Sequence, residues 1–253
     1  MRLKDRVVIV TGAARGIGRE YCLALAREGA KISAADILSC EETVVQVQRA
    51  GGEALTVAVD VTDEQSTQSM ATQTLERFGQ IDVLVNNAAL YGGLKLTPFE
   101  QIPATQWDQV MAVNVKGTWL CCKAVVPAMR QQGKGRIINI SSGTIWNGVP
   151  FILHYVTSKG AIFALTRALA RELSGAGINV NTITPGYTLT EASKTLMDPE
   201  AFKGFRQRVL DRQIIKRSEE ATDLTGTVLF LASDDSAFIT GQTINVDGGG
   251  AHH

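Results

Sequence analysis

The stretch Thr11-Gly12-Ala13-Ala14-Arg15-Gly16-Ile17-Gly18 decides the fold class of this chain. It directly follows an apolar run at 7–10 and opens a helical pattern at 16–28. Glycines in such a turn let the backbone approach a pyrophosphate, and the N-terminus of the next helix offers free N–H donors and a positive dipole. The spacing Gly-x3-Gly-x-Gly differs from the more common Gly-x-Gly-x2-Gly, but the strand–turn–helix context predicts a nucleotide site.

Short apolar runs and longer helical patterns alternate along the rest of the chain. We expect strands at 7–10, 31–35, 55–59, 81–85, 136–140, 178–183 and 243–246. We expect helices at 16–28, 41–50, 63–78, 106–131, 153–174 and 219–232, the third with a capping box at Thr62-Asp63-Glu64-Gln65. Several of the strands are apolar throughout, as parallel strands are when helices cover both faces. The pattern predicts an α/β fold: a doubly wound, Rossmann-type, mostly parallel seven-stranded sheet with helices on both faces.

The composition is that of a globular protein, with 253 residues, 45% hydrophobic and 20% charged. Without a linker or repeat, we expect one dinucleotide-binding and catalytic domain over 1–253, with a substrate lid in the least periodic stretch, 184–213. Lys+Arg and Asp+Glu both number 25, so the net charge of zero argues against a nucleic-acid partner. No apolar run reaches about 18 residues, and the charged N-terminus is unlike a secretory signal, so no membrane association is expected.

The cysteines and histidines argue for a cytoplasmic protein without a metal. Four cysteines are present and none forms a Cys-x-x-Cys pair, which favours a reduced, cytoplasmic setting. The adjacent Cys121 and Cys122 are also a poor disulfide pair. His154 is the one internal histidine, apart from a terminal pair at 252–253. A zinc site normally combines several His and Cys ligands, so no metal site is expected.

Asp36 ends the second expected strand, 18 residues after Gly18. An acidic residue about 20 positions after the glycine turn is placed to accept hydrogen bonds from the adenosine ribose. Its charge would repel a 2′-phosphate, which favours NAD over NADP. Arg15 argues mildly the other way, because a basic residue in the glycine turn could meet that phosphate. A second interpretation of Asp36 is an ordinary N-cap of the following helix.

Tyr155 and Lys159 have the i, i+4 spacing that places two side chains on one helix face. A free tyrosine titrates near pH 10, so a tyrosine base at neutral pH needs a pKa lower by about three units, or about 4 kcal/mol. A neighbouring ammonium favours the phenolate and shifts the pKa in that direction. Ser141 and Ser142 follow the expected strand at 136–140 and add hydroxyls at the same edge of the sheet.

With these residues the chain resembles the short-chain dehydrogenase/reductase family, in its single-domain branch. The likeness extends over 7–249, almost the whole chain. The matching segments are the glycine turn, Asp60-Val61, Asn86-Asn87-Ala88-Ala89, Asn114, Ser142, Tyr155-x3-Lys159, Pro185-Gly186 with Thr190, and Gly241-Gln242 with Val246-Asp247-Gly248-Gly249. Ala89 departs from the family, which usually has glycine there, and its extra methyl group bears on cofactor affinity rather than on cofactor use.

The resemblance implies roles for the matching residues. Ser142, 13 residues before Tyr155, would polarise the substrate oxygen, and Tyr155 would exchange a proton with it. Lys159 would bind the nicotinamide ribose and lower the pKa of Tyr155, while Asn114 would hold a water that relays protons from Lys159. Asp60 and Val61 would meet the adenine, and Thr190, with the backbone of Thr188, would bind the carboxamide. The full set expected to bind NAD is Gly12, Arg15, Gly16, Ile17, Gly18, Asp36, Asp60, Val61, Asn87, Ala88, Tyr155, Lys159, Pro185, Gly186, Thr188 and Thr190.

The resulting hypothesis is an NAD(H)-dependent oxidoreductase that interconverts a secondary alcohol and its ketone, with Tyr155 as general acid and base. An NADPH-dependent 3-oxoacyl-carrier-protein reductase is the alternative, although Asp36-Ile37-Leu38 stands where a basic residue would be wanted. Two alternatives come from other classes: a catalytically inactive nucleotide-binding regulatory protein and a SAM-dependent methyltransferase. Neither explains why Tyr-x3-Lys is present together with Ser142 and Asn114.

The small-molecule substrate is expected to contact Ser142, Thr144, Trp146, Tyr155 and Tyr187. Further candidates for the pocket wall are Leu90, Tyr91, Leu94, Ile145, Leu196, Met197, Phe202 and Phe205. This mostly apolar lining predicts a small, uncharged secondary alcohol or ketone that can carry an aromatic ring. Arg206 and Arg208 leave an acid as the chief rival. Trp146 and the lid aromatics have a second interpretation, in which they seal the core or an interface.

The resemblance also implies a homotetramer, paired through the helices at 106–131 and 153–174 and through the C-terminal strand. Ala161, Ala164 and Ala168 form a stripe of small residues on the second of these helices, which would permit close approach of a partner. The alternative is that these alanines pack on the sheet of their own chain.

Overall fold

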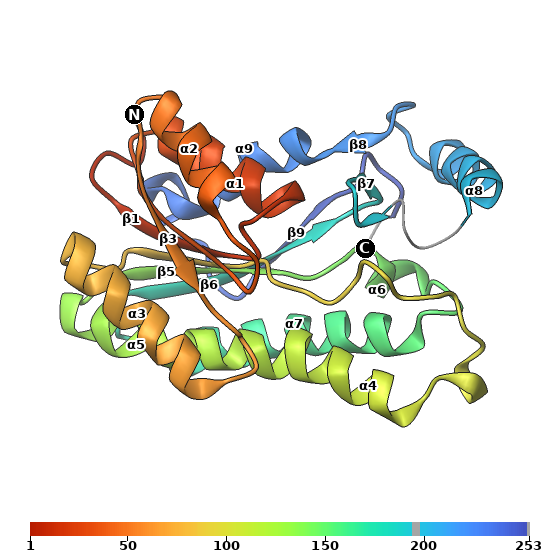
Figure 1. Cartoon of the computed structure of the whole chain (residues 1–253), viewed down its shortest axis with the longest axis horizontal. Helices are drawn as coiled ribbons and strands as arrows, with labels where there is room; N and C mark the ends of the chain where they lie inside the picture. Colours follow the sequence, from red (N-terminus) through yellow and green to blue (C-terminus); the bar gives the residue numbers. More distant parts are fainter. Residues whose placement is uncertain (194–197, 252–253) are drawn as a thin grey trace.

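The computed structural model describes residues 1–193 and 198–251. At its centre lies a parallel seven-stranded sheet in the order β3-β2-β1-β4-β5-β6-β9. The strands are β1 (Val7–Thr11), β2 (Lys31–Asp36), β3 (Glu53–Ala58), β4 (Val83–Asn86), β5 (Gly135–Ile140), β6 (Ile178–Pro185) and β9 (Thr243–Val246). Helices cover the sheet on both faces (Figure 1). The predicted doubly wound, Rossmann-type fold is confirmed.

Each face of the sheet has its own layer of helices (Figure 1). Helices α1 (Gly16–Arg27), α2 (Glu41–Arg49) and α9 (Thr225–Ala232) cover one face, and α3 (Glu64–Phe78), α5 (Gly117–Gln132) and α7 (Leu153–Glu172) cover the other. In β1, Val8 and Val10 pack into the first layer and Ile9 packs into the second. Burial on both faces explains why β1 is apolar throughout. Among the described helices, none is long and apolar enough to cross a membrane.

The strand order reverses beside β1, which lies between β2 and β4. The carboxyl ends of these strands therefore reach one edge of the sheet, where Thr11 is in register with Ala35. In open α/β sheets, ligands bind outside the carboxyl ends of the strands at such a reversal. The glycine turn, Asp36 and the segment after β4 thus meet at one place, although they lie far apart in the sequence.

The predicted helix at 106–131 is interrupted in the structure. It consists of α4 (Ala104–Met111), a π-helical turn at Ala112–Lys116 and then α5. The π turn carries Asn114, which is buried. Single π turns occur frequently at functional sites, because the extra residue changes the direction of a side chain without ending the helix. The apolar pattern continues through the turn, so the sequence showed one helix.

The predicted lid at 184–213 contains regular structure that its weak periodicity concealed. Helix α8 (Pro199–Arg212) begins after Asp198, whose carboxylate accepts from the backbone N–H groups of Glu200 and Ala201 at 3.1 and 2.9 Å. The short strand β7 (Thr188–Leu189) pairs with β8 (Glu219–Glu220). The predicted helix at 219–232 was therefore wrong at its start, where β8 and a 3-10 turn (Ala221–Leu224) precede α9.

The start of α3 also differs from the prediction. The N-cap is Asp63 rather than Thr62, and the Asp63 carboxylate accepts from the N–H groups of Gln65 and Ser66 at 3.2 and 3.3 Å. Asp is a good N-cap because its side chain satisfies N–H groups that the first helical turn leaves free. Thr62 instead donates its hydroxyl to Asp60 at 2.7 Å, which holds the chain that follows β3.

Candidate active site

A cavity of about 970 Å³ opens at the carboxyl edge of the sheet. All sixteen residues expected to bind the cofactor line it, from Gly12 in the first turn to Thr190 after β7. Ser142, Thr144 and Tyr187 line the same cavity, so the expected cofactor and substrate residues meet in one space. Asn114 and Trp146 are not among the described residues that line this cavity.

The glycine turn packs so closely at Gly12 and Gly18 that these two positions have no room for a side chain. At Gly12, where φ is +67°, a Cβ atom would lie 2.8 Å from the Cα of Ala88, and at Gly18 it would overlap the carbonyl oxygen of Gly12. The N-cap residue of α1, Arg15, makes no side-chain cap, so no capping side chain competes for the N–H groups of its first turn. Bare backbone and free helix N–H groups fit the pyrophosphate of a dinucleotide.

Asn87, in the segment after β4, fixes the position of the neighbouring glycine turn. Its side-chain amide donates to the carbonyl oxygens of Thr11 and Gly12 at 3.0 and 3.1 Å. The Thr11 hydroxyl in turn accepts from the backbone N–H groups of Asn87 and Ala88, both at 3.1 Å. The segment after β4 and the turn after β1 are therefore held together by four hydrogen bonds.

Asp36 has its carboxylate fixed at the mouth of the cavity. The two oxygens accept from the backbone N–H groups of Ala14 and Leu38, both at 3.0 Å. The N-cap of α2 is Cys40, so the interpretation of Asp36 as a helix cap is wrong. Arg15 also lines the cavity, but its guanidinium lies 4.0 Å from the carboxylate of Glu191, and both side chains are largely exposed. The carboxylate of Asp36 is thus fixed by two backbone N–H groups, whereas the guanidinium of Arg15 lies among exposed side chains.

The pair expected to meet the adenine occupies the same rim. The Asp60 carboxylate accepts from the backbone N–H of Thr62 at 2.8 Å, besides the Thr62 hydroxyl. Val61 packs so closely on Gly117 that a Cβ atom there would lie 2.7 Å from the valine methyl group. The hydrogen bonds to Asp60 fix the segment after β3 internally, and Val61 packs this segment against Gly117 at the start of α5.

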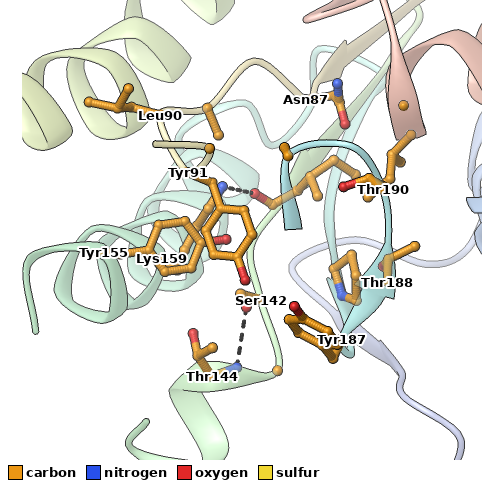
Figure 2. A pocket seen from close by; sticks show the side chains of 18 of the residues that line it. Asn87, Leu90, Tyr91, Ser142, Thr144, Tyr155, Lys159, Tyr187, Thr188 and Thr190 are labelled. Carbon is orange, nitrogen blue, oxygen red and sulfur yellow. Dashed lines mark hydrogen bonds between the residues drawn. The ribbon is translucent and has the colours of Figure 1, made fainter. Parts of the chain in front are cut away.

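The catalytic candidates gather on one side of the cavity. Figure 2 shows Tyr155, Lys159 and Ser142 there, with Thr188 and Thr190 opposite. The Lys159 ammonium donates to the carbonyl oxygen of Ile140 at 2.8 Å and lies 5.7 Å from the centre of the Tyr155 ring. Tyr155 and Lys159 are 7% and 3% exposed, so their charges act in a region of low dielectric.

Burial shifts both pKa values in the direction of the neutral side chains. It raises the pKa of Tyr155 to about 12, although the Ser142 hydroxyl opposes this rise. It lowers the pKa of Lys159 to about 8. The net shift of Tyr155 is opposite to the lowering expected from Lys159, because desolvation of the phenolate is the larger effect in this structure.

Asn114 supports the catalytic residues from behind the cavity wall. Its side-chain carbonyl accepts from the backbone N–H of Leu90 at 2.7 Å, and its amide donates to the Ser158 hydroxyl at 3.0 Å. Ser158 donates in turn to the backbone carbonyl of Tyr155 at 2.7 Å. Asn114 therefore connects the segment after β4 to the turn of α7 that carries Tyr155. Its expected role in a proton relay stays a prediction.

The substrate side of the cavity is built mainly from aromatic and aliphatic side chains. The Tyr187 hydroxyl donates to the carbonyl of Ser193 at 2.9 Å, and its ring meets Phe205 of α8 edge-on at 4.8 Å. The Tyr91 ring lies 4.8 Å from that of Tyr155 (Figure 2). Thr144 begins the short helix α6 (Thr144–Asn147) and donates its backbone N–H to the Ser142 hydroxyl at 3.3 Å.

Trp146, which the sequence predicts to contact substrate, is not among the described residues that line the cavity, and this contact stays a prediction. Its indole N–H donates to the Thr184 hydroxyl at 3.4 Å, and its ring meets Phe163 edge-on at 5.7 Å. The side chain of Trp146 thus packs against α7 and β6, because both of these elements lie on the inner side of α6. Packing is the interpretation that the structure favours for this residue.

The other candidates for the pocket wall divide in the same way. Leu90, Tyr91, Phe205 and Arg208 line the cavity. The described lining does not include Leu94, Ile145, Phe202 or Arg206, and Arg206 donates to the Ser218 hydroxyl at 2.7 Å. Leu196 and Met197 lie outside the described residues.

Phe151 and Leu96 line the rim of the cavity but were not among the residues predicted from the sequence to line it. Phe151 is 52% exposed and Leu96 is 44% exposed. Phe151 has a φ of +67°, which is uncommon for a bulky residue. Its carbonyl accepts from the N–H of Thr97 at 2.8 Å, which ties the two rim segments together. No local pattern marks such a conformation, so the sequence carried no usable signal for it.

Comparisons with known proteins identify relatives over nearly the whole chain. Residues 12–251 match a family model described as enoyl-(acyl carrier protein) reductase. The chain is 43% identical over 247 residues to the uncharacterized oxidoreductase Rv0769 of Mycobacterium tuberculosis, covering 97% of each protein. It is 36% identical over 248 residues to the 3-oxoacyl-[acyl-carrier-protein] reductase FabG of Staphylococcus epidermidis, covering 97% of this chain and 98% of the relative.

A solved structure matches over the same length. It is a 7α-hydroxysteroid dehydrogenase complexed with NADH and 7-oxo glycochenodeoxycholic acid, with a TM-score of 0.92 and 33% identity. The match covers all of this chain and 96% of that one. These matches span nearly the whole chain, and the fold they share binds a nicotinamide cofactor. The chain therefore belongs to the short-chain dehydrogenase/reductase family of oxidoreductases.

Proposed function

We propose that this protein is an NAD(H)-dependent enzyme that interconverts a secondary alcohol and its ketone. One observation carries the proposal: the Tyr155 phenol, the Ser142 hydroxyl and the Lys159 ammonium meet in a single cavity that also holds the fixed carboxylate of Asp36. A bound nicotinamide supplies or accepts the hydride. The protein's own task is to place the substrate oxygen and to exchange its proton.

Tyr155 is the residue that exchanges this proton. With its pKa raised to about 12, the phenol is protonated at neutral pH and can donate to the oxygen of a ketone. Oxidation of an alcohol requires the phenolate instead, and the Lys159 ammonium favours that form. Ser142, whose hydroxyl accepts from the N–H of Thr144, is placed to orient the substrate oxygen. Because the phenol stays protonated well above neutral pH, we expect the rate of ketone reduction to change little with pH around neutrality, while the rate of alcohol oxidation rises as the pH increases towards the pKa of Tyr155.

The choice of NAD rests on Asp36. Two backbone N–H groups hold its carboxylate beside the glycine turn, where a 2′-phosphate would be repelled. The 7α-hydroxysteroid dehydrogenase, whose structure contains NADH, supports this choice by analogy. The relatives named FabG favour the second candidate, an NADPH-dependent 3-oxoacyl-carrier-protein reductase. A comparison of NADH with NADPH in the reduction of an acetoacetyl thioester separates the two.

The substrate class follows from the apolar half of the cavity. Tyr91, Phe151 and Phe205 surround the space beyond Tyr155, and Leu96 stands at the rim. Pockets with this lining bind through buried apolar area and take their orientation from a few polar groups. A mostly apolar secondary alcohol, with an aromatic or alicyclic ring, is the substrate class that fits. Arg208, exposed at the same wall, keeps an acidic substrate as the rival.

We also propose the homotetramer that the family likeness implies. Ala164 and Ala168 are exposed on α7, so they do not pack on the sheet of their own chain. Trp119 on α5 is 45% exposed, although tryptophan is a residue that proteins largely bury. Light scattering should give about 109 kDa, four times the chain mass of 27.2 kDa. A mass near that of one chain in dilute buffer would overturn the tetramer.

The experiment that tests the activity is a substrate and cofactor panel. We would measure kcat/KM with NAD and with NADP for 1-phenylethanol, an aliphatic 2-alkanol, a hydroxy acid and a hexose. The proposal expects NAD to be preferred and the two apolar alcohols to be the better substrates. Preference for NADP would overturn the argument from Asp36, and preference for the hydroxy acid or the hexose would overturn the substrate class.

A further inference from the structure

Glu219 is a buried carboxylate that none of the roles described so far uses. It is 6% exposed and begins β8, where it pairs with Thr188 of β7. One carboxylate oxygen accepts from the Thr188 hydroxyl at 2.5 Å. The other accepts at 3.1 Å from the backbone N–H of Gly186, which also donates to the carbonyl of Val246 at 2.8 Å. A single side chain thus holds both ends of the segment 186–188.

The surroundings of Glu219 do not favour a negative charge. Burial raises its pKa to about 7, and the acidic Asp223 and Asp247 nearby add to the rise. Tyr21 of α1 lies near Glu219 with a fully buried hydroxyl that has no partner among the described residues. Arg217 is the cation on this side, and both arms of its guanidinium are bound to Asp223 at 2.6 Å. Burying a carboxylate without its own cation is costly, and a neutral side chain would serve packing alone as well.

The segment held by Glu219 forms the wall of the cavity opposite Tyr155. Gly186 and Thr188 line the cavity, and Figure 2 shows Thr188 on the side facing the catalytic residues. A Cβ atom at Gly186 would lie 2.8 Å from Glu219 Oε2 and 2.8 Å from Asp247 Cβ, so the segment lies directly on the carboxylate. This is the wall that the family likeness assigns to the carboxamide of the cofactor.

We propose that Glu219 is a positioning residue that holds the segment 186–188 in the conformation that binds the nicotinamide end of the cofactor. The inference rests on the proposed use of a nicotinamide cofactor and is independent of which alcohol is oxidised. As a carboxylate, Glu219 accepts from Thr188 and Gly186 together. Protonation turns one oxygen into a donor, so the Thr188 hydroxyl must reverse its hydrogen bond and the segment is held less firmly.

The test is calorimetric titration of the purified full-length protein with NADH between pH 6 and pH 9. We would compare wild type with Glu219→Gln and with the control Glu172→Gln, an exposed residue at the end of α7. The glutamine keeps one acceptor but turns an NH₂ group towards the remaining donor. At pH 8 we expect Glu219→Gln to bind NADH about tenfold more weakly than wild type, and Glu172→Gln to bind as wild type does.

The pH profile separates positioning from a merely structural role. Wild type should lose affinity as the pH falls through about 7, whereas Glu219→Gln should lack this loss. Lys159, whose pKa is lowered to about 8, titrates in both proteins, so the difference between the two profiles reports Glu219. The melting temperature at pH 8 should be similar in both, because the variant removes a costly buried charge. A large parallel loss of melting temperature and NADH affinity would overturn the proposal, as would unchanged affinity.

A second variant tests the same hydrogen bond by changing its donor, Thr188, instead of its acceptor, Glu219. Thr188→Val removes the donor without altering the carboxylate and should weaken NADH binding to a similar extent. The double variant should then bind no more weakly than the worse single variant, because both break the same contact. A loss in the double variant equal to the product of the two single losses would overturn the coupling.

The outcome is distinguishable from failure of the proposed function. NADH and NADPH share the nicotinamide end, so the Glu219→Gln effect should be the same for both even if NADPH proves to be preferred. Inactivity towards every alcohol in the panel, with the binding difference intact, would refute only the proposed activity. Unchanged NADH binding in Glu219→Gln, with normal alcohol oxidation, would refute only the role of Glu219.

Discussion

The two halves of the cavity differ in what lines them: backbone lines the cofactor half, and side chains line the substrate half. The cofactor half consists mainly of backbone at the ends of β1 and β2, with Asp36 and Asn87 each held by two hydrogen bonds to the main chain. The substrate half consists of ring side chains such as Tyr91 and Phe205, which are carried by loops and by α8. The first half has no room for added atoms at Gly12 and Gly18, whereas replacement of side chains can reshape the second half while the cofactor stays in place.

Tyr155 stands where the two halves meet, and its replacement should have the largest effect on turnover. Tyr155→Phe removes the phenol oxygen that we propose exchanges the proton, and it leaves Asp36, Lys159 and the glycine turn in place. We expect kcat to fall by about 100- to 10,000-fold, with NADH affinity little changed. Steady-state kinetics and NADH titration on the same sample measure both. Retention of half the wild-type kcat would refute the assignment.

Gly18→Ala tests the statement that the cofactor half has no room for added atoms at this position. The new Cβ would overlap the carbonyl oxygen of Gly12, so the turn must move. We expect NADH binding to weaken by roughly 10- to 100-fold and the free energy of unfolding to fall by about 1–3 kcal/mol. The matched control is Gly226→Ala in α9, where a Cβ meets no atom within 4 Å. Equal behaviour of the two variants in denaturant melts and NADH titration would break the comparison.

Asp36→Asn sharpens the account of cofactor choice, because it removes the charge and keeps a side-chain acceptor. The amide should no longer repel a 2′-phosphate, although one of the contacts with Ala14 and Leu38 is retained. We expect the ratio of kcat/KM for NAD over NADP to fall by about tenfold. An unchanged ratio would show that another group, such as Arg15, decides between the two cofactors.

Phe205→Ala should have the smallest effect, confined to the substrate half. Phe205 lines the cavity and packs on Tyr187, so its loss enlarges the pocket without touching the glycine turn. For an aryl alcohol we expect KM to rise by about three- to tenfold, with NADH affinity unchanged. Phe202→Ala is the control, since Phe202 lies on the same helix with its ring centre 6.4 Å from that of Tyr187 but is not among the described lining residues. Similar KM changes for both variants would show that packing of α8, not the pocket wall, sets the affinity.

Features that depend on local geometry could be predicted from the order of the residues alone. Burial of both faces makes β1 apolar throughout, and the turn after it admits only residues without a side chain at Gly12 and Gly18. The i, i+4 spacing that puts Tyr155 and Lys159 on one face is a property of any α-helix. Each of these signals is contained within a few residues, so the local pattern was enough to predict the fold class and to mark the glycine turn and the Tyr155–Lys159 pair, whereas most of the expected cofactor residues followed only from the family likeness.

The tertiary structure alone decided the features that depend on distant neighbours. The Trp146 ring packs on Phe163 of α7, and Asn114 occupies a π turn from which its side chain joins Leu90 to Ser158 of α7. Glu219 lies under Thr188 only because two short strands pair across 31 residues of sequence. Burial, too, rather than the neighbouring lysine, sets the direction in which the pKa of Tyr155 shifts. Desolvation, side-chain direction and long-range strand pairing depend on residues that are far apart in the chain. These features therefore cannot be predicted from a local sequence pattern.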